Sequence, residues 1–177
     1  MNLADLIRRL ENLIRPGTIA AVDPAAPRCR VKTGGLLTGW LPFQAQRAGE
    51  DSEWDPPSIG EQCIVVSPSG DPAVGFVLFG FYCDAFPAPD NSLTRHRRRY
   101  RDGALIDYDT ATHTLSATLP AGGKVHLVAP GGVSLLGDLD ITGLVTVSED
   151  VVAAGISLVG HVHGEVQSGL SNTGAPK

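Results

Sequence analysis

The chain has 177 residues, of which 42% are hydrophobic and 19% are charged, and its net charge is −5. This composition allows a packed core in one large domain or two small ones and excludes global disorder. The acidic balance excludes a uniformly basic nucleic-acid coat, and we expect neither a membrane span nor a signal peptide. Cys29, Cys63 and Cys83 are too scattered for a disulfide framework and are expected to be small core residues of a protein made in a reducing cytosol.

Residues 2–15 are expected to form an amphipathic helix. Asn2 is a candidate N-cap, and Pro16-Gly17 is expected to end the helix. One apolar stripe recurs at helical spacing and consists of Leu3, Leu6, Ile7, Leu10, Leu13 and Ile14. Two interpretations remain open, because the stripe can pack on the helix's own domain or on another subunit.

Five short segments that follow have the composition of β-strands and are separated by turn residues. The expected strands are residues 18–22, 28–33, 37–41, 62–67 and 73–81. Their number and spacing predict a small closed barrel of the OB type. Such barrels often bind oligonucleotides, but these strands lack alternating basic and aromatic positions, which disfavours that function.

A boundary is expected near residues 85–103, where the composition changes. All ten aromatic residues lie at or before Tyr108, and the only cations beyond residue 102 are Lys124 and Lys177. The densest charge run, residues 95–101, lies in this boundary. Three interpretations of the run remain open: a contact with phosphate or acidic lipid, a solvated connector, and pairing with the acids of a neighbouring chain.

From Gly103 onward, short apolar segments alternate with glycine turns. The expected strands are residues 104–108, 114–119, 124–129, 133–136, 138–142, 144–147 and 155–159. A single-chain sandwich of these strands would need larger core residues. A threefold intertwined β-prism, to which each chain gives one face, needs only a thin aliphatic interior, so the pattern favours a trimer.

His161-Val-His163 is the candidate metal-binding motif. Residues two apart in an extended chain point to the same side, so both imidazoles face one direction. Two nitrogens make a poor site, and two unrelated surface histidines are the alternative interpretation. Cupin and TIM-barrel hydrolase patterns do not fit the rest of the chain, which argues against a catalytic centre. Under threefold symmetry the pair would supply enough imidazoles for an octahedral ion such as Fe(II), and the flanking Gly160 and Gly164 would let three backbones approach.

Three stretches resemble the phage baseplate assembly protein V family, the central membrane-piercing spikes of contractile tails and R-type bacteriocins. Residues 155–176, with the two histidines and a Ser-Gly…Thr-Gly-Ala-Pro tail, resemble the tip of these spikes. Residues 57–71 resemble their barrel core, and residues 100–109 resemble the start of their spike. The tip departs from related tips at Glu165 and Leu170, where other small or polar residues are common.

The resemblance implies an all-β fold with an N-terminal helix. Its expected parts are a helix at 1–16, an OB-fold domain at 17–85, a connector at 86–103, a trimeric intertwined β-helix spike at 104–160 and a metal-binding tip at 161–177. It also implies one iron ion per trimer on the threefold axis, held by His161 and His163.

The function that follows is structural, and we expect no enzymatic activity. By the resemblance, the helix and barrel would contact baseplate hub and tail-tube end proteins, and the spike would pierce the target's outer membrane on contraction. The protein would belong to a virion or bacteriocin tail baseplate after assembly in the bacterial cytoplasm. The alternative function is an OB-fold nucleic-acid-binding module with an acidic C-terminal tail, although we expect no nucleic-acid partner.

Overall fold

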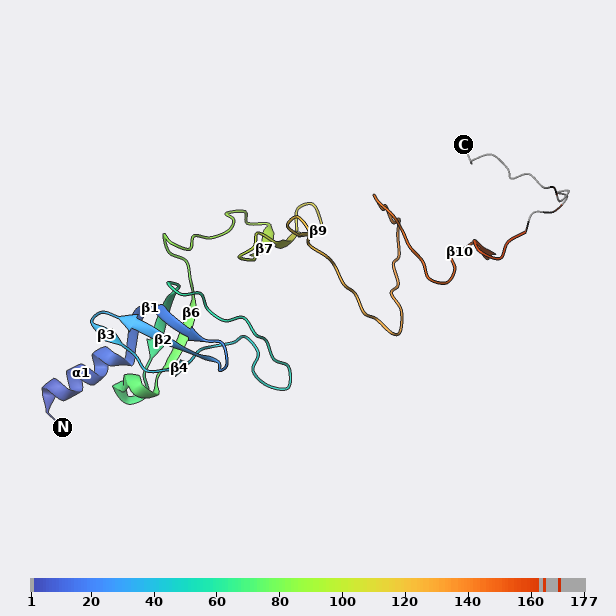
Figure 1. The fold of residues 1–177 in the computed structure, drawn as a ribbon. Coiled ribbons are helices and arrows are strands. Elements are labelled where there is room, and N and C mark those ends of the chain that lie inside the picture. Colours follow the sequence, from blue (N-terminus) through green and yellow to red (C-terminus); the bar gives the residue numbers. More distant parts are fainter. Residues whose placement is uncertain (1, 163, 165–168, 170–177) are drawn as a thin grey trace. The chain divides into compact units, whose positions relative to one another are not determined.

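The computed structural model describes residues 2–162, 164 and 169 (Figure 1). The chain divides into two units, Met1–Val125 and His126–Lys177. The first unit contains the helix α1, a barrel and a small three-stranded sheet, and the second contains one short hairpin among its described residues. Within the described part of the chain, no helix has both the length and the apolar character needed to cross a membrane.

The helix α1 spans Leu3–Leu13 and begins where the sequence predicts. The Asn2 side-chain oxygen accepts a hydrogen bond from Asp5 N at 2.8 Å, which satisfies one of the unpaired amides of the first turn. The Asp5 carboxylate lies 2.7 Å from an Arg8 nitrogen and 3.2 Å from an Arg9 nitrogen. The polar side of the helix is therefore held by its own ion pairs.

The expected helix end at Pro16-Gly17 is wrong, because both residues belong to strand β1 (Ile14–Asp23), which follows the helix directly. β1 is a central strand that pairs antiparallel with β5 (Gln62–Val66) and with β2 (Arg28–Thr33). A Cβ added to Gly17 would lie 2.5 Å from Val31 Cγ1. Glycine is therefore needed here for the close approach of β1 and β2.

The barrel is completed by β3 (Leu36–Leu37), β4 (Leu41–Pro42) and β6 (Phe76–Phe81). The strand order is β3-β2-β1-β5-β6, and β4 also pairs with β2. The ring closes after β4, where Gln44 N donates to Val77 O at 2.9 Å and Phe43 bridges Val77. The expected strand at 37–41 is thus divided between β3 and β4, and the one at 73–81 begins with a 3-10 turn, η2 (Pro72–Val74).

The barrel interior is small and aliphatic. Its buried residues are Ile19, Cys29, Val31, Leu41, Cys63, Val65 and Val77. Burial raises the pKa of the Cys29 thiol to about 11 and that of Cys63 to about 12, so both are neutral near pH 7. The expectation that these two cysteines are core residues is confirmed, whereas Cys83 is only half-buried.

Strands β7 (Arg95–Arg99), β8 (Leu105–Asp109) and β9 (Thr114–Thr118) form an antiparallel sheet, called the small sheet below. The basic run is therefore part of a strand, which corrects its assignment to a connector. Tyr100 N donates to Ala104 O at 2.9 Å across the β7–β8 turn. Gly103 occupies a φ of +91° in that turn, which favours glycine.

The second unit contains the hairpin of β10 (Val152–Ala153) and β11 (Ile156–Ser157). In the described residues of one chain, the strands expected at 124–129, 133–136, 138–142 and 144–147 are not formed. A strand requires a neighbour that accepts its backbone hydrogen bonds. The trimeric β-helix expected over this segment stays a prediction about an assembly of chains.

Candidate functional site

The arginines of β7 are matched with carboxylates across the small sheet. Arg95 and Arg97 lie on one face of β7, and the strand register places Asp109 opposite Arg95 and Asp107 opposite Arg97. Arg97 donates to Asp107 at 2.6 Å, and Asp90 of the preceding segment lies 3.0 Å from Arg95 and 3.2 Å from Arg97. We call these five residues the charged face. Its arginines pair with acids of their own chain.

Three members of the charged face, Asp90, Asp109 and Arg95, have pKa values shifted in favour of their ionised forms. Hydrogen bonds from Ser92 N and then from Arg95 hold the pKa of Asp90 below its ordinary value. The pKa of Asp109 is also lowered, first by a hydrogen bond from Ala111 N. Asp90 in turn raises the pKa of Arg95. Two guanidinium groups face three carboxylates, so this face carries no excess of positive charge.

The opposite face of the small sheet is open, and it carries His96 and Arg98 of β7 beside apolar residues of β8 and β9. Ile106, Tyr108, Leu115 and Ala117 share this side because residues on one strand alternate between faces and the β8–β9 register aligns them. The exposed fractions are 44% for Ile106, 40% for Tyr108 and 75% for Leu115. We call these four residues the apolar face.

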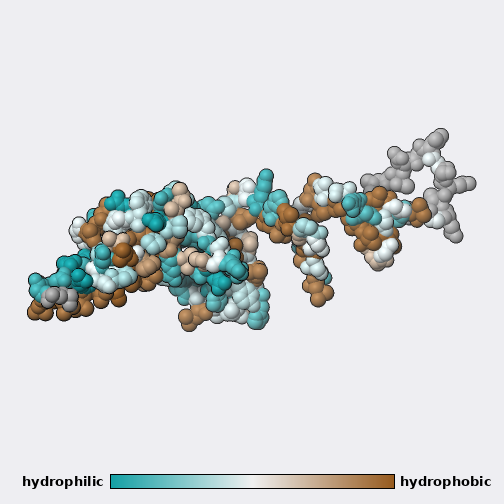
Figure 2. Space-filling model, turned by 90° about the horizontal axis from the view of Figure 1, so that it is seen from below, coloured by the Kyte–Doolittle hydropathy of each residue, from teal (hydrophilic) through white to brown (hydrophobic). Residues whose placement is uncertain are grey.

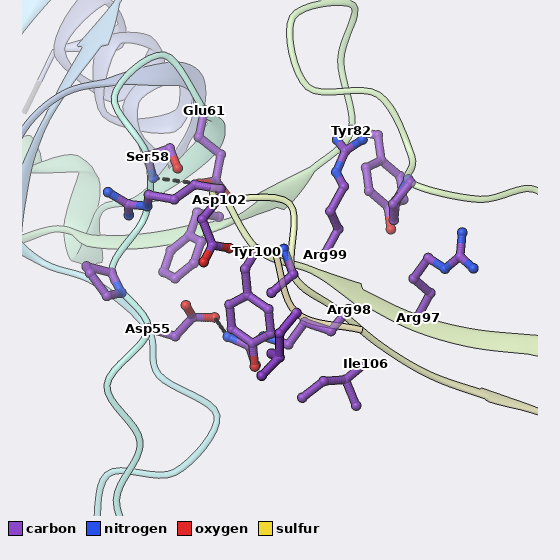
Figure 3. Close-up of a pocket in the computed structure, with 16 residues that line it drawn as sticks. Asp55, Ser58, Glu61, Tyr82, Arg97, Arg98, Arg99, Tyr100, Asp102 and Ile106 are labelled. Atoms are coloured by element: carbon purple, nitrogen blue, oxygen red, sulfur yellow. Dashed lines mark hydrogen bonds and ion pairs between the residues drawn. The ribbon is translucent and has the colours of Figure 1, made fainter. Parts of the chain in front are cut away.

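A hollow of about 930 Å³ lies between barrel loops and the β7–β8 hairpin (Figure 3). Arg98 reaches across it, with its guanidinium nitrogen 2.6 Å from the Asp55 carboxylate and its guanidinium carbon 5.1 Å from the centre of the Tyr100 ring. Ile106 of the apolar face also lines the hollow. Arg98 therefore joins the small sheet to the loop that connects β4 and β5 of the barrel.

The helix α1 is fixed to the barrel through its backbone. Gly70, in the 3-10 turn η1 (Pro68–Gly70), lies so close that an added Cβ would be 2.6 Å from Arg9 Cα. Ser67 N donates to Leu13 O at 2.8 Å. These backbone contacts fix the direction of α1 relative to the barrel.

The apolar stripe of α1 is not used in that contact. No residue of the helix is buried, and Leu3, Ile7 and Leu10 are exposed. Figure 2 shows apolar surface along the helix. Of the two interpretations that the sequence left open, packing of the stripe on its own domain is therefore wrong for the described residues.

Hydrogen bonds of the β10–β11 hairpin position His161. Asp150 accepts from Val159 N at 3.1 Å, and the Ser157 hydroxyl accepts from Gly160 N at 2.7 Å. A hydrogen bond from the Ser157 side chain, followed by that from Val159 N, lowers the pKa of Asp150. The turn before His161 is thus organised by side chains that sequence reasoning did not single out.

His161 has one nitrogen directed at backbone carbonyls. Its Nδ1 lies 2.9 Å from Ser157 O and 3.1 Å from Leu158 O. A carbonyl oxygen can only accept, so Nδ1 is the donor in these contacts. Histidines that bind a metal through Nε2 commonly direct Nδ1–H to a backbone carbonyl in this way. His161 therefore fits the role of a metal ligand.

The second histidine of the motif, His163, lies outside the described residues. Within the described residues, no group of three or more His, Cys, Asp or Glu side chains is arranged to hold a metal ion. The described part of one chain therefore offers a suitable ligand and not a complete centre.

Comparison with known proteins connects the barrel and the histidine motif. Residues 15–82, nearly all of the barrel, match the family described as Type VI secretion system/phage-baseplate injector OB domain. Residues 155–177, which include both histidines, match the GpV Apex motif. The chain is also 38% identical over 135 residues to the spike protein of Escherichia phage P2. The chain belongs to the phage baseplate spike family. The alignment covers 73% of this chain and 64% of the length of that relative.

These matches confirm the family and the OB barrel expected from the sequence. Sequence reasoning missed the pairing of Arg95 and Arg97 with Asp109 and Asp107. A signal was available, because the Asp102-Gly103 turn between the two charge patterns is a typical hairpin turn. The sequence holds no such signal for the pairing of Asp90 with Arg95 and Arg97. It holds none for the pairing of Asp55 with Arg98 either.

Proposed function

We propose that this protein is the structural spike at the centre of a contractile-tail baseplate. The observation that carries the proposal is the presence, in one chain of the spike family, of an injector OB domain near one end and an apex motif near the other. A barrel that contacts the baseplate and an apex motif in the same chain suit a mechanical role. In this role the protein has no catalytic step.

The proposed active form is a homotrimer. Among the described residues beyond the small sheet, many apolar side chains are exposed in one chain; Leu136 and Leu144, for example, are 106% and 91% exposed. Exposed apolar surface of this extent is typical of an interaction surface. Three chains wound around a common axis would cover these side chains with one another and give their backbones strand partners.

In the proposed mechanism, the barrel and α1 contact baseplate hub and tail-tube end proteins, and contraction drives the apex through the target's outer membrane. The protein would be assembled in the bacterial cytoplasm and carried in the tail baseplate of a phage or a bacteriocin. The exposed stripe of α1 supports a docking role for the helix.

We also propose that His161 and His163 of each chain bind one iron ion per trimer on the threefold axis. The orientation of His161, with Nδ1 at the Ser157 carbonyl, supports this assignment. Imidazole is a suitable ligand for iron, and an octahedral ion would accept two nitrogens from each of three chains. When bound, the ion would cross-link the three chain ends into a single point.

A mass measurement with metal analysis tests both parts. Native mass spectrometry of the purified protein should give three chains and one iron. The His161→Ala/His163→Ala double variant should give three chains without iron. A monomeric wild-type protein would contradict the trimer, and equal metal in both proteins, or none in the wild type, would contradict the iron site.

The nucleic-acid alternative has less support. Arg95, Arg97 and Arg98 are engaged by carboxylates of their own chain, which reduces their availability for phosphates. We expect any oligonucleotide affinity to be weak and steeply salt-dependent. Tight binding at physiological salt, measured by fluorescence anisotropy, would favour the alternative.

A further inference from the structure

We propose that the outer face of β2 in the barrel binds an extended acidic segment of a partner polypeptide. The surface consists of Arg28, Arg30 and Lys32 with Trp40 beside them, and we call these four residues the basic face. The inference goes beyond the proposed spike and depends on neither the trimer nor the iron ion. It supplies the chemistry by which the barrel would select a partner.

The alternation of β2 places three cations in a row on the outside of the barrel. Cys29, Val31 and Thr33 are buried, so the basic residues that alternate with them point away from the core. The expectation that the barrel strands lack such alternation is therefore wrong for the basic positions of β2. Outward side chains recur about every 6.6 Å along a strand, and hydrogen bonds to β1 on one side and to β3 and β4 on the other keep this spacing fixed.

No carboxylate among the described residues forms an ion pair with these three cations. Asp23 of β1 lies opposite Arg28 in the strand register, but its carboxylate accepts a hydrogen bond from Ala25 N at 2.9 Å in the turn. The other β1 residues opposite the row, Thr18 and Ala21, carry no charge. The arginines of the charged face are matched within their own chain, whereas the basic face is left for an anion from another molecule.

The middle cation of the row is held in place by its own chain. Arg30 Nε donates to Thr38 O at 2.9 Å, and the guanidinium carbon lies 6.0 Å from the centre of the Trp40 ring. Thr38 is fixed in turn, because its hydroxyl accepts a hydrogen bond from Val31 N at 2.9 Å. These contacts use only Nε, so the terminal nitrogens of Arg30 can donate to a carboxylate. A guanidinium that is already ordered loses less entropy when a ligand binds.

The surroundings of the row favour a polypeptide over a nucleic acid. Leu37 lies opposite Lys32 and is 48% exposed, and Trp40 is 45% exposed, so apolar side chains border the charges. A single-stranded nucleic acid needs a series of aromatic side chains on which successive bases stack, and the basic face has one. In an extended peptide every second side chain points the same way, with the same repeat as β2. Acidic residues at alternate positions would therefore align with the three cations.

Fluorescence anisotropy with the full-length protein tests the inference. The probe is a fluorescein-labelled 12-residue peptide in which glutamate alternates with threonine, and the matched probe has glutamine in place of glutamate. We expect the glutamate peptide to bind at least about 10-fold more tightly, because it can form several charge pairs with the row. Arg30→Gln and Arg28→Gln should each weaken its binding about 5-fold. Arg99→Gln removes the same charge from β7, outside the basic face, and should change the binding by less than about 2-fold because salt screens distant charges.

Each variant should keep the circular dichroism and the mass of the wild type, and Arg28→Gln, at an exposed position, serves alone if Arg30→Gln does not fold. Equal weakening by Arg99→Gln would indicate general charge attraction and overturn the inference. A wild-type protein that does not bind the glutamate peptide, or binds the glutamine peptide as tightly, overturns it as well. Tighter binding of a 12-nucleotide single-stranded DNA would assign the face to nucleic acid and overturn the choice of a polypeptide. The mass and the iron content of the protein test the proposed function separately.

Discussion

Replacing Gly70 with alanine should destabilise the contact between α1 and the barrel by more than backbone strain alone. Gly70 is buried and has a φ of +71°, a conformation that costs other residues roughly 1–2 kcal/mol. An added Cβ would also lie 2.6 Å from Arg9 Cα and 2.7 Å from Arg9 C, where ordinary contacts begin at 3.4 Å. These are backbone atoms that cannot rotate away, so the helix itself must shift by close to an ångström.

Gly80→Ala is the matched control. Gly80 has a φ of +96°, but nothing lies within 4 Å of the position of an added Cβ. We therefore expect Gly80→Ala to lower the free energy of unfolding by about 1–2 kcal/mol, from strain alone. Gly70→Ala should lower it by about 2–5 kcal/mol, because overpacking adds about 1–3 kcal/mol to the same strain.

Equilibrium urea unfolding measures both losses. Trp40 and Trp54 lie in the part of the chain that forms the barrel, so their emission reports its unfolding. Far-ultraviolet circular dichroism follows the helix in the same samples. Equal losses in the two variants, or a smaller loss for Gly70→Ala, would refute the argument that the barrel needs glycine where α1 passes.

Three further results are expected. The pKa values of Asp90 and Asp109 are lowered in the folded protein, so their ionised forms stabilise the small sheet above their ordinary pKa of 3.8, and this stability is lost as the pH falls below it. The difference in melting temperature between pH 5 and pH 3 should therefore be smaller in an Asp109→Asn variant than in the wild type. At pH 8, Cys29 and Cys63 should resist a thiol reagent until urea unfolds the barrel, because burial leaves little thiolate; labelling at the rate of a free thiol would contradict their burial. Leu10→Ser should leave the urea midpoint of the barrel nearly unchanged and reduce incorporation into baseplates, measured by particle pull-down, because Leu10 is exposed on α1.

The region around β1 shows what the sequence could predict and what it could not. Helical spacing and the Asn2 cap are local features, and they predicted the start of α1 correctly. Pro16-Gly17 is also a local signal for a helix end, but Gly17 is required by Val31, a residue of another strand. The sequence near Gly17 contains no trace of that contact, so it predicts a helix that continues to residue 15, two residues beyond the end of α1.

The candidate sites have the same limit. The His-x-His spacing identified His161, but the carbonyl of Ser157 that accepts from its Nδ1 comes from the shape of a turn. The role of the basic run stays open at the level of sequence because two of its partners, Asp107 and Asp109, lie across a hairpin. In the segment after β9, the strand expected at 155–159 contains β11, whereas its partner β10 lies where no strand is expected.

The direct passage from α1 into β1 has a mechanical consequence. β1 is held on one side by β5 and on the other by β2, and ladder hydrogen bonds run perpendicular to the strands. A pull or push on α1 along the direction of β1 therefore loads both ladders in shear, so that many hydrogen bonds resist together and none can open singly from an end. No flexible loop separates the helix from this strand, so a load on α1 is transmitted to the central strand of the barrel with little deformation between them.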